Sequence, residues 1–409
     1  MIVLQEPIKN EFGLSDLQLG LMNGPAFALL YVIASIPIAR LAERANRITI
    51  IAIAVACWSA MTALCGLAGS FTQMLLARSG VSIGEAGCAP ASQSVISDYF
   101  PADRRATALA IWALGLPVGG VLAALSGGIL ADRYGWRMAF FVLGVPGLVV
   151  AVLLKLTVRE PPRTALGRPP TFFHVIRMLG AKRTFRHAVL GAAIAMFVAS
   201  GSGQYGASFL LRVYHLSLTQ VALAVGLLVG IFQGLGIFLG GFMADRLAPR
   251  YPTAIAWLPG TSLLLAAPIT IAALGAETFP IYLPLALLGM LSLYPFTASM
   301  YAIPQGIASP DMRATAAAIV LVIVSVVGLG LGPPAVGVLS DWFASQDRHA
   351  LGVTAAACHA GGTAALRASC ARASSEGLRH ALMACTALYV WAGVHFILAA
   401  RTLREDWVA

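Results

Sequence analysis

Apolar stretches of about 20 residues, the length that carries an α-helix across the hydrocarbon layer, recur along almost the whole chain. Short segments rich in charged residues, Gly and Pro separate them, and Gly and Pro inside the stretches are tolerated in packed membrane helices. The pattern predicts an all-α polytopic membrane protein. We expect eleven transmembrane helices in this chain, near residues 17–39, 48–69, 71–97, 105–131, 136–157, 188–211, 219–243, 253–274, 280–304, 314–340 and 380–400.

The longest interruption, residues 158–187, is rich in Pro and basic residues and divides the chain. It predicts an N-terminal helix bundle over 1–157, a linker over 158–187 and a C-terminal six-helix bundle over 188–409. Inside the linker, apolar residues recur at helical spacing from Phe172 to Leu179. Two interpretations stay open for this segment: an amphipathic helix on the membrane surface, or a loop that only tethers the halves.

The two halves resemble each other in sequence. The segment ADRRATALAI (102–111) matches DMRATAAAI (311–319), and GILAD (128–132) matches GVLSD (337–341), at offsets of 208 and 209. Internal duplication in a very apolar chain is typical of membrane transporters.

A second match, Ala42-Glu43-Arg44 with Ala244-Asp245-Arg246 at an offset of 202, pairs span 17–39 with span 219–243. The partner of span 188–211 would then begin before Met1. We expect that the first helix is truncated here and that the full protein has twelve spans. The alternative is an eleven-span protein that begins on the external side.

Composition agrees with a membrane location, because 59% of residues are hydrophobic, 11% are charged and the mean hydropathy is +0.83. Of the 27 Lys and Arg residues, 18 fall on one predicted side, 8 on the other, and Arg78 lies within a span. The positive-inside rule places the linker and the C-terminus in the cytoplasm, in a multi-pass protein of the cell membrane. The net charge of +10 therefore reflects topology, and we expect no nucleic-acid partner.

Cys358 and Cys370 share the long predicted external loop 342–378, where either a disulfide or two free thiols is compatible with the sequence.

Several loop motifs resemble those of the major facilitator superfamily. They are ARLAERANR (39–47), its better preserved second copy GGFMADR (240–246), and the Gly and Pro rich segment GLPVGG (115–120). The first copy departs from the usual pattern, since Ala39, Glu43 and Asn46 replace Gly, Asp and Gly. The resemblance implies a fold of two pseudo-symmetric helix bundles.

A finer resemblance is to the spinster-like branch, associated with export of sphingolipids and lysolipids. It rests on GLMNGPAFALLY (20–31), WSAMTALCGLA (58–68), RSGVSIGEAGCAPASQSVISDYFPADRRA (78–106) and GWRMAFFVLGVPG (135–147). In that family an Asp-Arg pair of the first helix works with an Arg and a Glu of the fourth. The latter two map onto Arg78 and Glu85, whereas the Asp-Arg pair would precede Met1.

Apart from residues at helix ends, Arg78 and Glu85 are the ionisable residues inside the first-half spans. They are seven residues apart, two helical turns on one face. A charge in hydrocarbon costs roughly 2.5–3.5 kcal/mol unless it faces a bundle interior or water. We therefore predict that Glu85 carries a coupling proton and that Arg78 holds an anionic substrate group. The alternative is a buried network that only fixes helix packing.

We predict gating roles for charges at helix ends, where ion pairs can form in one transport state and break in the other. Topogenic charge alone is the alternative interpretation. The gating candidates are Glu43, Arg44, Arg105, Asp245, Arg246, Arg313, Asp132 and Asp341. Polar residues predicted to line a substrate cavity, besides Arg78, are Asn23, Tyr31, Gln93, Gln204, Tyr205, Tyr294, Thr297 and Tyr301.

Together these features predict a secondary active transporter that is proton-coupled, works by alternating access, and moves a small organic anion or an amphipathic lipid-like substrate as a monomer. No His-Glu cluster, nucleophile constellation or phosphate-binding loop lies in the spans, so we expect no enzyme, no metal and no cofactor. The alternatives are a transport-inactive truncated protein and, less in keeping with the sequence, an intramembrane enzyme.

Overall fold

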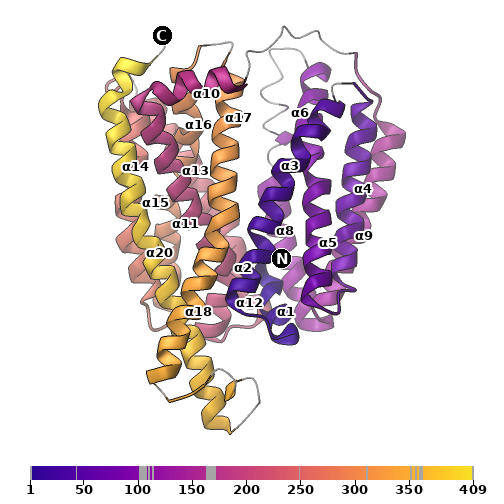
Figure 1. Cartoon of the computed structure of the whole chain (residues 1–409), viewed down its shortest axis with the longest axis vertical. Coiled ribbons are helices and arrows are strands. Elements are labelled where there is room, and N and C mark those ends of the chain that lie inside the picture. Colours follow the sequence, from indigo (N-terminus) through magenta and orange to yellow (C-terminus); the bar gives the residue numbers. More distant parts are fainter. Residues whose placement is uncertain are drawn as a thin grey trace. The chain divides into compact units, whose positions relative to one another are not determined.

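The structure is a computed structural model, shown in Figure 1. It describes the chain except for residues 1, 43, 101–107, 109–110, 113–114, 163–171, 248, 310–311, 351, 355–356, 359–362 and 408–409. Within the described residues, every regular element is helical. The all-α prediction therefore agrees with the structure.

The chain forms two compact units that do not follow the sequence order strictly. Unit 1 comprises Met1–Leu14, Leu21–Gly167 and Ser217–Gly226, and unit 2 comprises Ser15–Gly20, Arg168–Leu216 and Leu227–Ala409. Each unit thus takes one short helical segment from the other half of the sequence. The two segments, Ser15–Gly20 and Ser217–Gly226, are equivalent in the internal repeat at an offset near 202.

Unit 1 contains the helices of the first half. In chain order they are η1 (Ile2–Leu4), α1 (Gln5–Phe12), the last residues of α2 (Asp16–Asn23), α3 (Pro25–Ala42), α4 (Arg47–Cys65), α5 (Phe71–Ala86), α6 (Cys88–Tyr99), α8 (Gly115–Tyr134) and α9 (Trp136–Thr157), together with α12 (Leu218–Val225).

Unit 2 contains the start of α2 and the helices of the second half. These are α10 (Phe172–Ala181), α11 (Arg183–Tyr214), most of the π-helical segment η2 (Gly226–Phe232), α13 (Gln233–Leu247), α14 (Ala254–Leu274), α15 (Phe279–Leu293), α16 (Phe296–Ile307), α17 (Arg313–Val324), the π-helical segment η4 (Ser325–Leu331), α18 (Gly332–Ala350) and α20 (Ala364–Asp406).

Where the structure describes them, the predicted spans fall on helices, but several are broken. Span 17–39 is split at Gly24, span 71–97 at Gly87, and span 280–304 at Tyr294 and Pro295. Within the described ranges, nine helical stretches are long and apolar enough, by length and composition, to cross a membrane. The count of eleven spans stays a prediction.

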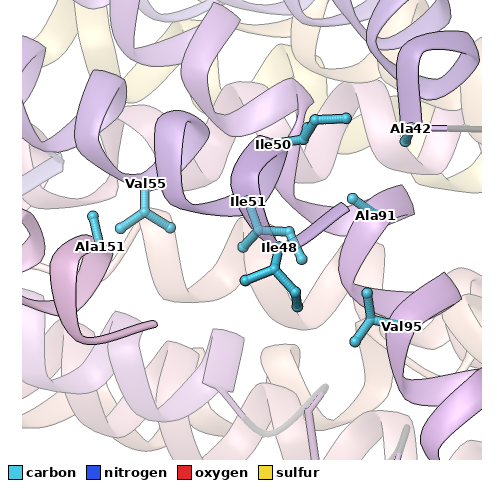
Figure 2. Close-up of a cluster of buried hydrophobic side chains, with 8 residues drawn as sticks. All are labelled: Ala42, Ile48, Ile50, Ile51, Val55, Ala91, Val95 and Ala151. Atoms are coloured by element: carbon cyan, nitrogen blue, oxygen red, sulfur yellow. The ribbon is translucent and has the colours of Figure 1, made fainter. Parts of the chain in front are cut away.

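Unit 1 has an apolar core where α4 packs against α6, α9 and the end of α3. Figure 2 shows its eight buried side chains, most of them β-branched or small: Ala42, Ile48, Ile50, Ile51, Val55, Ala91, Val95 and Ala151. Small residues also bring backbones together, since a Cβ on Gly84 of α5 would lie 2.7 Å from the Trp58 nitrogen of α4. Close approach through small residues is the usual way to pack membrane helices.

The linker ends in helix α10, whose apolar residues Val175 and Leu179 are fully buried. The helix packs on α11 and α17 of its own unit, so this part of its surface is covered by protein. Just after it, the Lys182 ammonium donates to the carbonyls of Ile307 (2.9 Å) and Asp406 (2.8 Å). One cation thus satisfies carbonyls at the C-terminal ends of α16 and α20.

A disulfide joins Cys358 and Cys370, whose Cα atoms are 5.8 Å apart. Of the two alternatives open for this pair, the structure has the bond. It ties the start of the 43-residue helix α20 to the segment that precedes it.

Candidate transport site

The two charged residues predicted to carry transport lie on α5. This helix begins after Ser70, whose side chain caps it by accepting from the Gln73 amide, and ends at Gly87. Arg78 and Glu85 are seven residues apart in it, which corresponds to a rise of about 10 Å along one face. Neither side chain is fully exposed, as both are half-buried.

Arg78 faces the aromatic ring of Phe27 on α3. Its guanidinium carbon lies 5.2 Å from the ring centroid, a cation–π geometry. The Phe27 carbonyl accepts a hydrogen bond of 2.5 Å from the Ser82 hydroxyl, which fixes α3 against α5 between the two charges. The Nε atom of Arg78 is buried and has no hydrogen-bond partner. A half-buried guanidinium whose Nε–H lacks an acceptor is suited to bind an anionic ligand.

Glu85 lies one helical turn beyond Ser82 and close enough to Tyr31 of α3 for their charges to interact. Within the described part of the chain, no ion pair of 4.0 Å or less joins Glu85 to Arg78. The carboxyl and the guanidinium are therefore two neighbouring groups and not one closed salt bridge. Each remains available for its own chemistry.

The other first-half residues predicted to line a substrate cavity differ in where they lie. Asn23 is buried at the end of α2, one residue before the helix break, and Tyr31 is half-buried on α3, within electrostatic range of Glu85. Gln93, on α6, is exposed. The structure therefore brings Tyr31 to the charged pair and leaves Gln93 on the surface of its helix.

In unit 2, three predicted residues lie at the break between α15 and α16. Tyr294 stacks on Phe296 with ring centroids 6.2 Å apart, Tyr301 is half-buried, and the hydroxyl of Thr297 is buried without a partner. The repeat aligns Glu85 with Tyr294 at an offset of 209, so the two halves break a helix within two residues of equivalent positions. The break is duplicated but the charge is not.

Gln204 and Tyr205 lie on α11, where Gln204 is half-buried. The Tyr205 side chain is fully buried and its hydroxyl donates to the carbonyl of Asp16, so a substrate-binding role for Tyr205 stays a prediction. This hydrogen bond holds a helix start, as described below. A buried Tyr hydroxyl needs an acceptor, and sequence alone did not indicate which one.

The predicted gating residues on the side that carries most of the Lys and Arg residues form two groups. Glu43 and Arg105 lie outside the described residues. The other four, Arg44, Asp245, Arg246 and Arg313, are all exposed. Their gating role stays a prediction.

A buried network at the same ends of the unit 1 helices was not predicted. Arg47, only 3% exposed, donates through Nε to Glu160 at 2.6 Å and through one terminal nitrogen to Ser94 at 2.8 Å and to Asp98. Burial raises the pKa of the Glu160 carboxyl, but the hydrogen bonds from the Arg47 side chain and the Ile48 amide outweigh burial and lower that pKa overall. The network joins the start of α4, the end of α6 and the segment after α9.

Asp132 and Asp341 are equivalent in the repeat, and each accepts hydrogen bonds from backbone amides at the start of a helix in its own unit. The Asp132 carboxylate accepts from the backbone amides of Leu218 (3.2 Å) and Thr219 (2.7 Å) at the start of α12. The Asp341 carboxylate accepts from the amides of Asp16 (3.1 Å) and Leu17 (2.9 Å) at the start of α2. Each Asp therefore caps the N-terminus of a helix from the other half of the sequence.

Sequence reasoning missed Asp16 and Arg212, which form a buried bidentate ion pair in unit 2. Asp16 precedes an apolar stretch and looked like an ordinary start of a span. Only the fold brings it to Arg212, 196 positions away. Asp98 and Glu160 were missed for the same reason.

Comparison with known proteins bears on this arrangement. The family model described as "Major Facilitator Superfamily" matches residues 1–333. The chain belongs to the major facilitator superfamily. Its relatives include an "MFS-type efflux pump" of Mycolicibacterium smegmatis, 33% identical over 83% of this chain and 79% of that protein. The "Protein spinster homolog 1" of Homo sapiens is 28% identical over 82% of this chain and 68% of its own length.

Among solved structures, a bacterial homolog of the human lysosomal transporter spinster is similar over 100% of this chain and 94% of that one. The sequence identity is 38% and the TM-score is 0.90. That structure is described as inward-facing and unoccupied, and a second one of the same kind as inward-facing and occupied. The chain is accordingly a spinster-like membrane transporter and not an enzyme, as its motifs predicted.

Proposed function

We propose that this protein is a proton-coupled secondary transporter that works by alternating access and carries a small organic anion or an amphipathic, lipid-like anion. One observation carries the proposal: α5 holds a half-buried cation and a half-buried carboxyl that are not paired with each other. Ionisable groups inside a membrane bundle usually mark ion or substrate paths.

Glu85 is the proton carrier in this proposal. A carboxyl between helices, away from bulk water, changes its proton affinity when a nearby charge arrives or leaves. An anion bound at Arg78 neutralises the guanidinium and favours the protonated form of Glu85. Proton uptake and anion binding are then linked through groups about 10 Å apart on one helix face.

Arg78 is the anion-binding group. The Phe27 ring holds the guanidinium by its face, and Nε remains without an acceptor. A phosphate or carboxylate of the substrate would supply that acceptor and form a charge-assisted hydrogen bond. The Phe27 ring beside it, with Tyr31 on the same helix α3, provides apolar surface for a substrate with a hydrocarbon part.

The charge distribution supports the orientation in this proposal. The linker and the C-terminus are cytoplasmic, and the disulfide-bonded hairpin at Cys358 is external in the cell membrane. The proposal also includes eleven transmembrane spans in this chain and a monomeric state.

A flux assay tests the coupling. Proteoliposomes holding a trapped pH dye receive a single-chain lipid phosphate, or a neutral single-chain glycerol ester of equal length as control. We expect the phosphate to drive a proton flux that Glu85→Gln abolishes and Glu85→Asp retains in part. An unchanged flux in Glu85→Gln would refute the proton role of Glu85.

A binding assay tests Arg78 separately. Arg78→Gln should weaken binding of the lipid phosphate by roughly tenfold or more, as expected for a lost charge-assisted bond, and leave the neutral ester unaffected. Arg133→Gln, on the exposed end of α8, is the matched control and should change neither. Equal losses for both lipids would argue for a packing role.

A further inference from the structure

The start of helix α2 is held in unit 2 by two sets of contacts. The first set is a cap, in which the Asp341 carboxylate accepts from the Asp16 amide at 3.1 Å and the Leu17 amide at 2.9 Å. A carboxylate at a helix N-terminus satisfies free amides and interacts favourably with the helix dipole. We call segment Ser15–Gly20, with the groups that hold it, the unit 2 latch.

The second set locks the side chain of Asp16. Its carboxylate accepts from both terminal nitrogens of Arg212 at 2.7 Å and from the Ser340 hydroxyl at 2.6 Å. The Tyr205 hydroxyl donates to the Asp16 carbonyl. Asp16 is 3% and Arg212 8% exposed, so the pair is shielded from water and salt.

The repeat builds a matching device in unit 1. Segment Ser217–Gly226, capped by Asp132, is the unit 1 latch. In both latches a Gly four residues before the capping Asp lets the helix start approach closely. A Cβ on Gly128 would lie 2.8 Å from the Leu218 oxygen, and one on Gly337 2.6 Å from the Asp16 oxygen. The motif Gly-x-x-x-Asp therefore forms both docking surfaces on one helix face.

The two latches differ in charge. Leu218 occupies the position equivalent to Asp16, so the unit 1 latch has no carboxylate for an ion pair there. Asp132 is exposed to solvent and also accepts from the Thr219 hydroxyl. The unit 1 latch is a cap, whereas the unit 2 latch is a cap with a buried ion-pair lock.

Each latch is followed by an irregular segment at the equivalent position. Helix α2 ends at Asn23 and the chain turns at Gly24 before α3, while α12 passes into the π-helical segment η2 at Gly226. Breaks and π-helical turns are sites where a helix changes direction at low cost. The latched helix ends can therefore move without moving the rest of the helix.

We propose that the two latches are release points, at which the start of a helix can leave its docked position, and that the Asp16–Arg212 lock makes the unit 2 latch the one that opens last. The inference rests on the proposed alternating access, because a latch that never released would block opening. The inference gives Asp16, Arg212, Ser340 and Tyr205 a role in holding a helix start that does not require them to bind substrate.

Hydrogen exchange of the backbone amides tests the latches directly. In the intact protein in lipid nanodiscs, peptides spanning 15–20 should exchange more slowly than those spanning 217–222. Asp341→Asn should speed exchange at 16 and 17 roughly fivefold or more, the effect of a lost N-cap, without changing 218 and 219. Asp132→Asn should do the reverse.

A labelling experiment tests release. Leu19 and Val221 are equivalent in the repeat and both 0% exposed, so Leu19→Cys and Val221→Cys are matched reporters after the four free cysteines are replaced. Arg212→Gln should raise labelling of Cys at position 19 by a membrane-impermeant maleimide at least about fivefold. Glu11→Gln, which removes a more exposed ion pair to Arg137, is the control and should leave labelling unchanged.

The outcomes distinguish this inference from the transport proposal. Equal exchange in both segments, or unchanged labelling in Arg212→Gln, would overturn the unequal latches. Since Arg212→Gln could unfold the protein, Asp16→Asn combined with Arg212→Gln serves as a second variant that leaves no buried unpaired charge and should still speed labelling. Neither readout needs a substrate, so loss of proton coupling in the Glu85 assay leaves the latch result intact.

Discussion

The unit 1 latch and the unit 2 latch derive from one duplicated motif, yet they hold a helix end with different strength. In both, a carboxylate accepts hydrogen bonds from two backbone amides, and a Gly allows the start of the docked helix to approach closely. Only the unit 2 latch adds a buried bidentate ion pair, between Asp16 and Arg212. The two halves thus share the docking geometry but differ in energetics, because Asp16 has an ion-pair partner and its repeat equivalent is Leu218.

The largest effect is expected from Arg212→Ala, which leaves the Asp16 carboxylate buried without its cation. Breaking one partner of a buried pair costs about 3–5 kcal/mol. The apparent melting temperature in detergent should fall strongly, and Asp16→Asn in the same chain should recover much of it. If the single variant melts like the wild type, the lock does not stabilise unit 2.

The next largest effect is expected from alanine at the docking glycines. Gly337→Ala and Gly128→Ala each place a Cβ against a helix backbone, and overpacking of this kind costs about 1–3 kcal/mol. Because both sites are equally tight, the two variants should release their latches to a similar degree. Labelling at positions 19 and 221 measures this, and a strong difference between them would show that shape also distinguishes the latches.

Smaller effects separate the two caps. Loss of an N-cap costs about 0.5–2 kcal/mol, and an exposed carboxylate gains less because solvent screens it. Asp341→Asn should therefore destabilise more than Asp132→Asn, which is exposed. Thermal unfolding of the two variants side by side checks the order. The reverse order would mean that the ion pair holds α2 without help from the cap.

In the Arg47 network of unit 1, the contribution of the Glu160 carboxylate to stability should depend on pH. The pKa of Glu160 is lowered, so its stabilisation is present above its unfolded pKa of about 4.3 and is lost as the pH falls through the lower folded value. Wild type and Glu160→Gln should differ by a constant amount between pH 7 and 5 and converge only as the pH falls below the lowered pKa of Glu160. A difference that persists in acid would assign the effect to packing.

Much of the fold followed from the sequence. The alternation of apolar stretches and charged loops predicted the helices, because length and hydropathy alone decide whether a segment can span a membrane. The loop motifs indicated the superfamily, and the resemblance at Arg78 and Glu85 pointed to one helix of the first half. The internal repeat alone indicates that Asp132 and Asp341 are equivalent.

The breaks inside spans could not be predicted from hydropathy. Gly24, Gly87 and Pro295 interrupt helices whose apolar pattern runs on without change. The same holds for Tyr205, which was expected at a substrate site and is bonded to the Asp16 carbonyl. Polar residues inside a membrane bundle all need partners, and the sequence does not say which partner each one finds.

The sequence by itself determined that this chain is a duplicated, all-helical membrane protein and that Arg78 and Glu85 share one span of its first half. It could do so because composition, periodicity and repeat are local or linear properties. Only the tertiary structure decided that Arg78 and Glu85 stay unpaired and that Asp16 meets Arg212 across 196 positions. Ion pairs depend on distances of a few ångströms between remote segments, and those distances are set by packing.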